Sequence, residues 1–129
     1  MAEALLLAYN MDPSTTASLQ SLCSRLGLRY RAVNPWEYGQ PIGALAGLPV
    51  KASSANAPAS PFGDPMLVMC HMLSPQLDAF LSGMREDNIP RVALKAVLTP
   101  VNVLWNSFRL RDELAHEHEA ICQGTSKRN

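Results

Sequence analysis

ALLLAYNMDP at residues 4–13 and MLVMCHMLSP at residues 66–75 follow the same pattern. Each begins with an apolar run that predicts a buried strand, and each ends with a capping residue and a proline that open a helix. A second strand-forming run, LRYRAVNP or RVALKAVLTP, follows each predicted helix. The sequence therefore predicts an internal repeat of strand, helix and strand over residues 4–34 and 66–99.

Two topologies place the first and third strands at the centre of the sheet, where their apolar runs would be buried. One is an α+β, ferredoxin-like βαββαβ sandwich with antiparallel central strands, followed by a long C-terminal helix. The other is an α/β open parallel sheet of four strands in the order 2-1-3-4. A parallel crossover normally contains a helix, and residues 35–65 offer only a short candidate at 42–46, so we favour the ferredoxin-like plan.

Length and charge limit the classes of protein to which the chain can belong. Its 129 residues are the size of one domain, which we place at 1–129. Lys plus Arg and Asp plus Glu are both 11, so the formal net charge is zero. Nucleic-acid binders usually carry a basic excess, whereas near-neutral chains tend to self-associate. We therefore expect a homodimer and no nucleic-acid partner.

Cysteine content and hydropathy point to the cytoplasm. The chain has three cysteines, too few and too scattered for a disulfide framework, which favours a reducing compartment. The N-terminus lacks the basic region and the long apolar run of a secretory signal. No apolar stretch approaches the roughly 20 residues that cross a bilayer, so we expect no membrane association.

Two further segments have distinct compositions. Residues 51–65 are rich in Ala, Ser and Pro and poor in large apolar side chains, which predicts a flexible loop. Thr99 and Pro100 then open a predicted C-terminal helix over residues 100–122. One apolar stripe of that helix is expected to pack in the core, and it comprises Val101, Leu104, Trp105, Phe108, Ala115 and Cys122.

A second apolar stripe of the same helix predicts a dimer interface. It consists of Val103, Leu110, Leu114 and Ile121. A helix that is apolar on two sides must cover two surfaces, and the sheet accounts for only one of them. Either a second copy of the chain covers this seam, or the 35–65 segment folds over it within one chain.

The chain resembles an uncharacterised bacterial family, a domain of unknown function. The resemblance rests on QPIGALAG at residues 40–47, AVLTPVNVLW at 96–105 and ELAHEH at 113–118. It implies a small cytoplasmic bacterial protein to which no activity, cofactor or catalytic residue is assigned. It also implies signature positions without roles, and these are Gln40, Pro41, Gly43, Gly47, Thr99, Asn102, Trp105, Glu113, Glu117 and His118.

No catalytic, metal-binding or cofactor-binding motif stands out from the sequence. His116 and His118 point about 200° apart on a helix and cannot share one ion. Glu113 and His116 match one arm of a di-iron site, but the chain lacks a second such arm. Cys70 and His71 are neighbours on a strand, where consecutive side chains face opposite sides. We therefore expect no metal and no cofactor.

Candidate ligand-binding residues fall in the signature segments and at the predicted helix openings. They are Thr99, Asn102, Trp105, His71, Gln40, Gly43 and Gly47. Free N–H groups in the first turn of a helix favour anions, and segments outside regular elements often carry function. The competing interpretation is local, with a helix cap at Thr99, a turn bond at Asn102 and a core anchor at Trp105.

The function expected from the sequence is that of a non-enzymatic binding or regulatory module that self-associates, with an unknown protein or a small molecule as a further partner. The alternative is a small-ligand sensor or an enzyme with its site at the helix N-termini. The topology distinguishes the two. A parallel sheet would gather Asn10, His71, Thr99 and Asn102 at one end. A ferredoxin-like sheet would place Asn10 at the opposite end from the others.

Overall fold

The computed structural model describes residues 4–48 and 62–127, with the side chains described as far as His118. The described chain is an α+β structure with a four-stranded sheet. The strands are β1 (Leu5–Tyr9), β2 (Arg29–Ala32), β3 (Met66–Cys70) and β4 (Leu94–Val97). The helices are α1 (Pro13–Leu26), α2 (Ile42–Leu45), α3 (Ser74–Glu86) and α4 (Ser107–Lys127). Two short 3-10 turns are η1 (Pro35–Glu37) and η2 (Asn102–Leu104).

The sheet is mixed, with strand order β2-β1-β3-β4. β1 pairs in parallel with β2, and β3 pairs in parallel with β4. The two central strands are antiparallel, so Leu5 lies opposite Cys70 and Tyr9 lies opposite Met66. Each edge strand therefore pairs with the central strand of its own strand–helix–strand unit.

Neither expected topology describes this sheet completely. The ferredoxin-like plan gives the antiparallel central pair but is not confirmed, because it would place each edge strand beside the central strand of the other unit. The parallel plan gives the order 2-1-3-4 but not the strand directions. The connection between β2 and β3 explains why the central strands are antiparallel. Residues 62–65 return to the end of the sheet at which β2 ends, where the Asn10 side chain binds the carbonyl oxygens of Phe62 and Asp64. β3 therefore runs back against β1.

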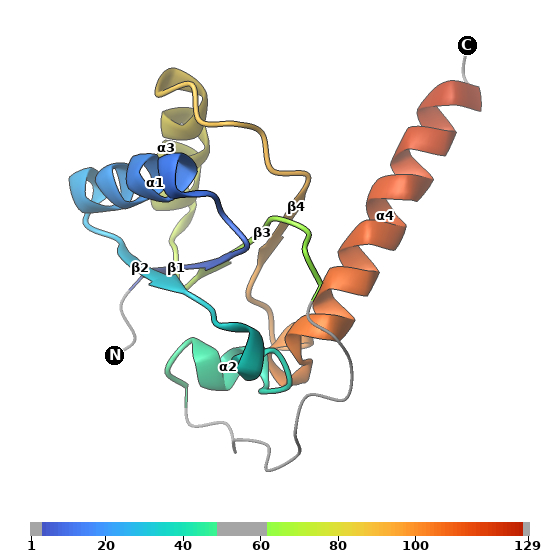
Figure 1. Ribbon diagram of the computed structural model, residues 1–129. Coiled ribbons are helices and arrows are strands. Elements are labelled where there is room, and N and C mark those ends of the chain that lie inside the picture. The colour runs from blue at the N-terminus through green and yellow to red at the C-terminus, as the bar shows by residue number, and fades with distance from the viewer. Residues whose placement is uncertain (1–3, 49–61, 128–129) are drawn as a thin grey trace.

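Both faces of the sheet are covered (Figure 1). α1 and α3 lie on one face, over a core that includes Leu6 and Leu67. The segment of η1 and α2, together with α4, covers the other face, over a core that includes Leu7 and Val68. Successive residues of a strand face opposite sides, so β1 and β3 must be apolar throughout to fill both cores. This explains their continuous apolar runs.

The helix boundaries follow local capping chemistry. Asp12 accepts a hydrogen bond of 2.7 Å from the Thr15 N–H, and Pro13 is the first helical residue of α1, as expected. Gly27 ends α1 in the left-handed conformation, with φ of 73°. α3 differs from the prediction, because Ser74 is its first residue and not its cap. The Gln76 side chain accepts instead from the Leu73 N–H at 2.9 Å.

The C-terminal helix does not run from Pro100 to Cys122 as predicted. α4 begins at Ser107, and η2 interrupts the chain before it. Trp105 takes an extended conformation with ψ of 151°, and its carbonyl accepts from the Ile42 N–H at 2.7 Å. Asn106 then caps α4, since its side chain accepts from the Arg109 N–H at 2.9 Å. At Trp105, a contact with the α2 segment therefore interrupts the helix that was predicted to be continuous.

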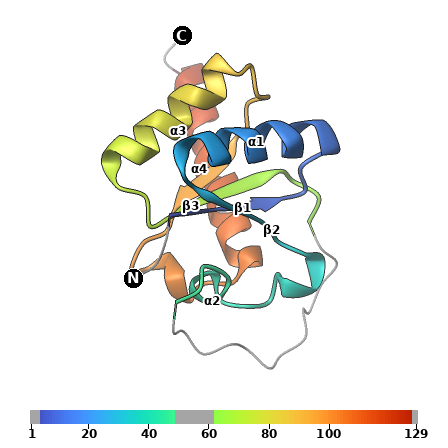
Figure 2. The same ribbon diagram turned by 90° about the vertical axis from the view of Figure 1, so that its left-hand side faces the viewer.

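α1 and α3 lie side by side over one face of the sheet (Figure 2). They approach each other closely at Gly83, where a Cβ atom would lie 2.5 Å from Cδ1 of Leu22. Leu22 is fully buried, so its side chain has little room to move away. The absence of a side chain at Gly83 thus sets the spacing of the helical layer.

We predict that Gly83→Ala lowers the free energy of unfolding by about 1–3 kcal/mol, the usual effect of overpacking a filled core. Urea unfolding followed by circular dichroism measures it. Gly63→Ala is the matched control, because a Cβ there meets nothing within 4 Å. An equally small loss in both variants would contradict the packing that we describe.

Candidate functional site

Two of the three signature segments meet in space. The α2 segment carries Gln40, Gly43 and Gly47, and it packs against the η2 segment, which carries Thr99, Asn102 and Trp105. Pro41 forms an isolated β-bridge with Asn106, next to the bond between the Ile42 N–H and the Trp105 carbonyl. The sequence thus identified two segments that are neighbours, although they are far apart along the chain.

The polar groups of Thr99 and Asn102 bond to each other and to the end of β4. Asn102 Oδ1 accepts from the Thr99 N–H at 2.8 Å, and Asn102 Nδ2 donates to the Val97 carbonyl at 3.0 Å. Thr99 Oγ1 accepts from the Asn102 N–H at 3.0 Å. Asn102 is only 7% exposed. These bonds fix the turn, which supports the local interpretation of both residues.

Four more of the candidate ligand-binding residues occupy positions that the packing or the backbone of the fold explains. Trp105 is half-buried, and the Arg109 guanidinium lies 4.5 Å from the centre of its ring. Gly43 is buried inside α2, and Gly47 follows α2 with φ of 83°, where a side chain would strain the backbone. His71 Nε2 lies 3.3 Å from the carbonyl oxygen of Ala46.

Asn10 is separated from His71 by the length of the central strands. It follows Tyr9, which lies opposite Met66, whereas His71 follows Cys70, which lies opposite Leu5. Asn10 and His71 therefore stand at opposite ends of the central strands. The pocket that a parallel sheet would have formed from Asn10, His71, Thr99 and Asn102 is not assembled.

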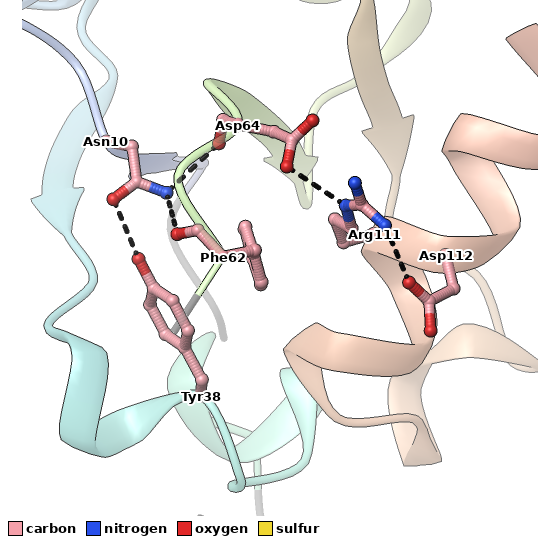
Figure 3. A network of polar contacts seen from close by, with 6 residues as sticks. All are labelled: Asn10, Tyr38, Phe62, Asp64, Arg111 and Asp112. Carbon is pink, nitrogen blue, oxygen red and sulfur yellow. Dashed lines mark hydrogen bonds and ion pairs between the residues drawn. The ribbon is translucent and has the colours of Figure 1, made fainter. Parts of the chain in front are cut away.

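Asn10 belongs to a different polar network, which holds the returning chain (Figure 3). Its side chain donates to the Phe62 and Asp64 carbonyls at 2.8 and 3.0 Å, and it accepts from the Tyr38 hydroxyl at 3.1 Å. The Asp64 carboxylate accepts from Arg111 of α4 at 3.0 Å. Most of the predicted 51–65 loop lies outside the described residues, but its end, from Phe62 onward, is bound by these contacts.

The predicted dimer seam is covered in part by the chain itself. Leu110 is 2% exposed and belongs to the core beneath α2 and α4, and Leu114 packs against the same core. Val103 is half-buried, and the side chain of Ile121 lies outside the described residues. The alternative, in which the 35–65 segment folds over the seam, accounts for Leu110, because Tyr38 and Ile42 share its core cluster.

Four exposed apolar side chains lie at the end of the sheet at which β3 and β4 finish. Leu73 is 72% exposed, Val97 40%, Val101 65% and Leu104 69%. Figure 2 shows the connection from β3 to α3 and the turn after β4 at the same end of the sheet. We call these four residues the apolar end surface. Among the described residues, Trp36 is the other large apolar side chain that is exposed, at 75%.

Sequence reasoning missed this surface because it extended the helix back to Pro100. In a continuous helix from Pro100, Val101 and Leu104 lie on the stripe that was expected to pack in the core, together with Trp105. The η2 turn and the extended backbone of Trp105 break the phase, so Val101 and Leu104 face solvent. Their exposure was not detectable from apolar periodicity alone.

Within the described residues, Cys70 is not placed as a nucleophile and no metal cluster is found. Cys70 lies in the core with its Sγ 3.7 Å from the Val68 carbonyl, and burial raises the pKa of its thiol to about 12. The thiol is therefore protonated at neutral pH and is a poor nucleophile. No three His, Cys, Asp or Glu side chains within the described residues are placed to share a metal ion. A helix long and apolar enough to cross a membrane is likewise not found in residues 4–48 and 62–127.

One family model matches part of the chain. Residues 65–121 match the model of a domain of unknown function, DUF3783. The match begins just before β3, extends into α4 and contains the whole apolar end surface. This confirms the resemblance to a domain of unknown function, while QPIGALAG lies outside the matched residues. No curated protein and no solved structure matches the chain.

We predict that stability falls in alkaline solution because of the buried thiols. Burial raises the pKa of Cys70 to about 12 and that of Cys23 to about 11, both from 9.0. The unfolded chain therefore releases these protons first, and stability present below about pH 9 is lost as the pH rises through the folded pKa values. Cys70→Ala should reduce the decline by about 1 kcal/mol per pH unit between about pH 9.5 and 11.

Urea unfolding at several pH values measures this decline in both proteins. The variant controls for other groups that titrate in the same range, because it retains them all. Identical slopes in the two proteins would show that the Cys70 thiol ionises equally in the folded and unfolded states.

Proposed function

We propose that this protein is a non-enzymatic binding module that forms a homodimer through the apolar end surface. The observation that carries the proposal is that Leu73, Val97, Val101 and Leu104 are all exposed at one end of the sheet. Grouped apolar side chains of this kind mark interaction sites, whereas a single exposed residue such as Trp36 needs no explanation. The matched domain of unknown function includes all four residues.

The turn that carries Val101 and Leu104 is suited to binding. The hydrogen bonds between Thr99 and Asn102, and from Asn102 to Val97, hold its backbone in one conformation. A surface that is already ordered loses less conformational entropy when it binds. Burying a side chain such as Leu104 contributes about 1.5–3 kcal/mol, so a few such residues support a moderate interface.

A second copy of the chain is the partner that we favour. The formal net charge is zero, so two copies do not repel each other through their overall charge. A two-fold dimer is also the commonest assembly of soluble chains, and it pairs one surface with itself. The buried free thiols of Cys23 and Cys70 fit a reducing compartment, and we propose the cytoplasm.

A small-ligand sensor or an enzyme at the helix N-termini has less support. The polar groups of Thr99 and Asn102 are engaged within the turn. Asn10 stands at the other end of the sheet, where it binds residues 62–64 and Tyr38. No specific contact among these residues favours that alternative.

We predict that the wild type sediments as a dimer at tens of micromolar, on the order expected for a moderate interface. Val101→Glu combined with Leu104→Glu should weaken association at least about tenfold, because two charges would be desolvated at the contact. Sedimentation equilibrium measures the constant, and circular dichroism checks the fold. Trp36→Glu is the matched control, an equally exposed apolar residue elsewhere, and it should leave the dimer intact.

Three results would contradict the proposal. The wild type could sediment as a monomer at about 100 µM, far above a moderate dissociation constant. The folded double variant could dimerise like the wild type, or Trp36→Glu could dissociate the dimer to the same extent.

A further inference from the structure

A cavity of about 430 Å³ opens beside β4, on the face of the sheet covered by α1 and α3. Its lining is Met69, Leu81, Met84, Arg85, Ile89, Arg91 and Lys95. The lining thus comes from β3, α3, the connection after α3 and β4. This volume lies in the range of cavities that take up small organic ligands.

The packing of the helical layer accounts for the position of the cavity. Lys95 is the ladder partner of Leu67, so it stands on the same face of the sheet as the core residue Leu67. α3 is drawn close to α1 at Gly83, where a side chain would collide with Leu22. The helical layer therefore leaves space over β4, on the far side of α3 from α1.

The floor of the cavity is apolar and firmly packed. Met69 is 4% exposed, Met84 5% and Ile89 8%, and all three belong to the core cluster under α1 and α3. An apolar floor of this kind binds the hydrocarbon part of a ligand through the hydrophobic effect.

The rest of the lining is positively charged. Arg85, Arg91 and Lys95 line the cavity, and among the described residues no Asp or Glu side chain does so. None of the three forms a salt bridge with a residue in the described part of the chain. Asp87 is paired instead with Arg25 at 3.2 Å. Within the part of the chain that the structure describes, three cations and no carboxylate stand at this apolar cavity, which favours an anionic ligand.

We propose that this cavity binds a small carboxylate with an apolar body, such as a medium-chain fatty acid. The hydrocarbon lies against Met69, Met84 and Ile89, and the carboxylate is bound by Arg91 and Lys95 at the charged side. An arginine fork donates two parallel hydrogen bonds to a carboxylate, which makes such a pair stronger than a neutral contact. The cavity lining includes none of the four residues of the apolar end surface, although Val97 of that surface is the ladder partner of Met69.

Methionine methyl groups report directly on this site. The chain has six methionines, of which Met69 and Met84 line the cavity. Met66 is fully buried in the core on the opposite face of the sheet, where it serves as an internal reference. In protein labelled with ¹³C at the methionine methyls, we predict that decanoate shifts the Met69 and Met84 resonances in a saturable manner and leaves Met66 unchanged.

Charge recognition is tested with a matched ligand and matched variants. Decanol has the same hydrocarbon body without the carboxylate, and it should bind at least about tenfold more weakly. Lys95→Ala and Arg91→Ala should each weaken decanoate binding by about tenfold. Arg109→Ala removes one cation next to Trp105, away from the cavity, and it should bind decanoate like the wild type.

The proposal fails if decanoate leaves Met69 and Met84 unshifted, or if decanol binds as tightly as decanoate. It also fails if the folded Lys95 and Arg91 variants bind like the wild type. An acidic amphipathic peptide that shifts Met69 where decanoate does not would assign the cavity to a protein partner instead. If a variant does not fold, the comparison of decanoate with decanol on the wild type still tests whether the cavity recognises the carboxylate.

Discussion

The antiparallel pairing of β1 with β3 determines the positions of most other features of this protein. It joins two strand–helix–strand units through their central strands, with Leu5 opposite Cys70 and Tyr9 opposite Met66. Because both strands are apolar on both faces, the sheet needs a covering layer on each side. The pairing also places Asn10 at one end of the sheet and His71 at the other. The polar network of Asn10 and the apolar end surface therefore lie at opposite ends.

The second covering layer explains why the C-terminal helix packs within its own chain. Among the described residues, those of α2, η1, 62–65 and α4 cover that face. Tyr9, Tyr38, Phe62 and Phe108 form an aromatic cluster there, with Tyr38 and Phe62 stacked at 4.6 Å between ring centres. The buried hydroxyls of Tyr9 and Ser107 bond to each other at 2.8 Å. Leu110 completes this core, which removes it from the predicted dimer seam.

Local patterns in the sequence predicted the elements of secondary structure better than their arrangement. Asp12, Pro13 and Gly27 predicted the two ends of α1, because helix capping and a left-handed backbone conformation depend on residue type. No residue pattern predicted the strand order and directions, since both candidate topologies bury the same two strands. The internal repeat of residues 4–34 and 66–99 stays a prediction.

The candidate sites depended on features that local patterns do not encode. The contact of Asp64 with Arg111 joins residues 47 positions apart, and no spacing rule predicts it. Val101 and Leu104 became surface residues because backbone contacts of Trp105 and Asn106 with the α2 segment interrupt the helix. Arg91 and Lys95 flank a cavity only because α3 lies close to α1. Each of these sites is a consequence of packing between segments distant in sequence.

The most direct test of this account is the set of backbone nuclear Overhauser effects between β1 and β3. Antiparallel pairing predicts cross-peaks that join Leu5 to Cys70 and Tyr9 to Met66, the two ends of the observed register. Adjacent strands lie about 4.8 Å apart, which is within reach of the measurement. Cross-peaks that join Leu5 to Met66 and Tyr9 to Cys70 would show parallel central strands. They would place Asn10 beside His71 and contradict the account.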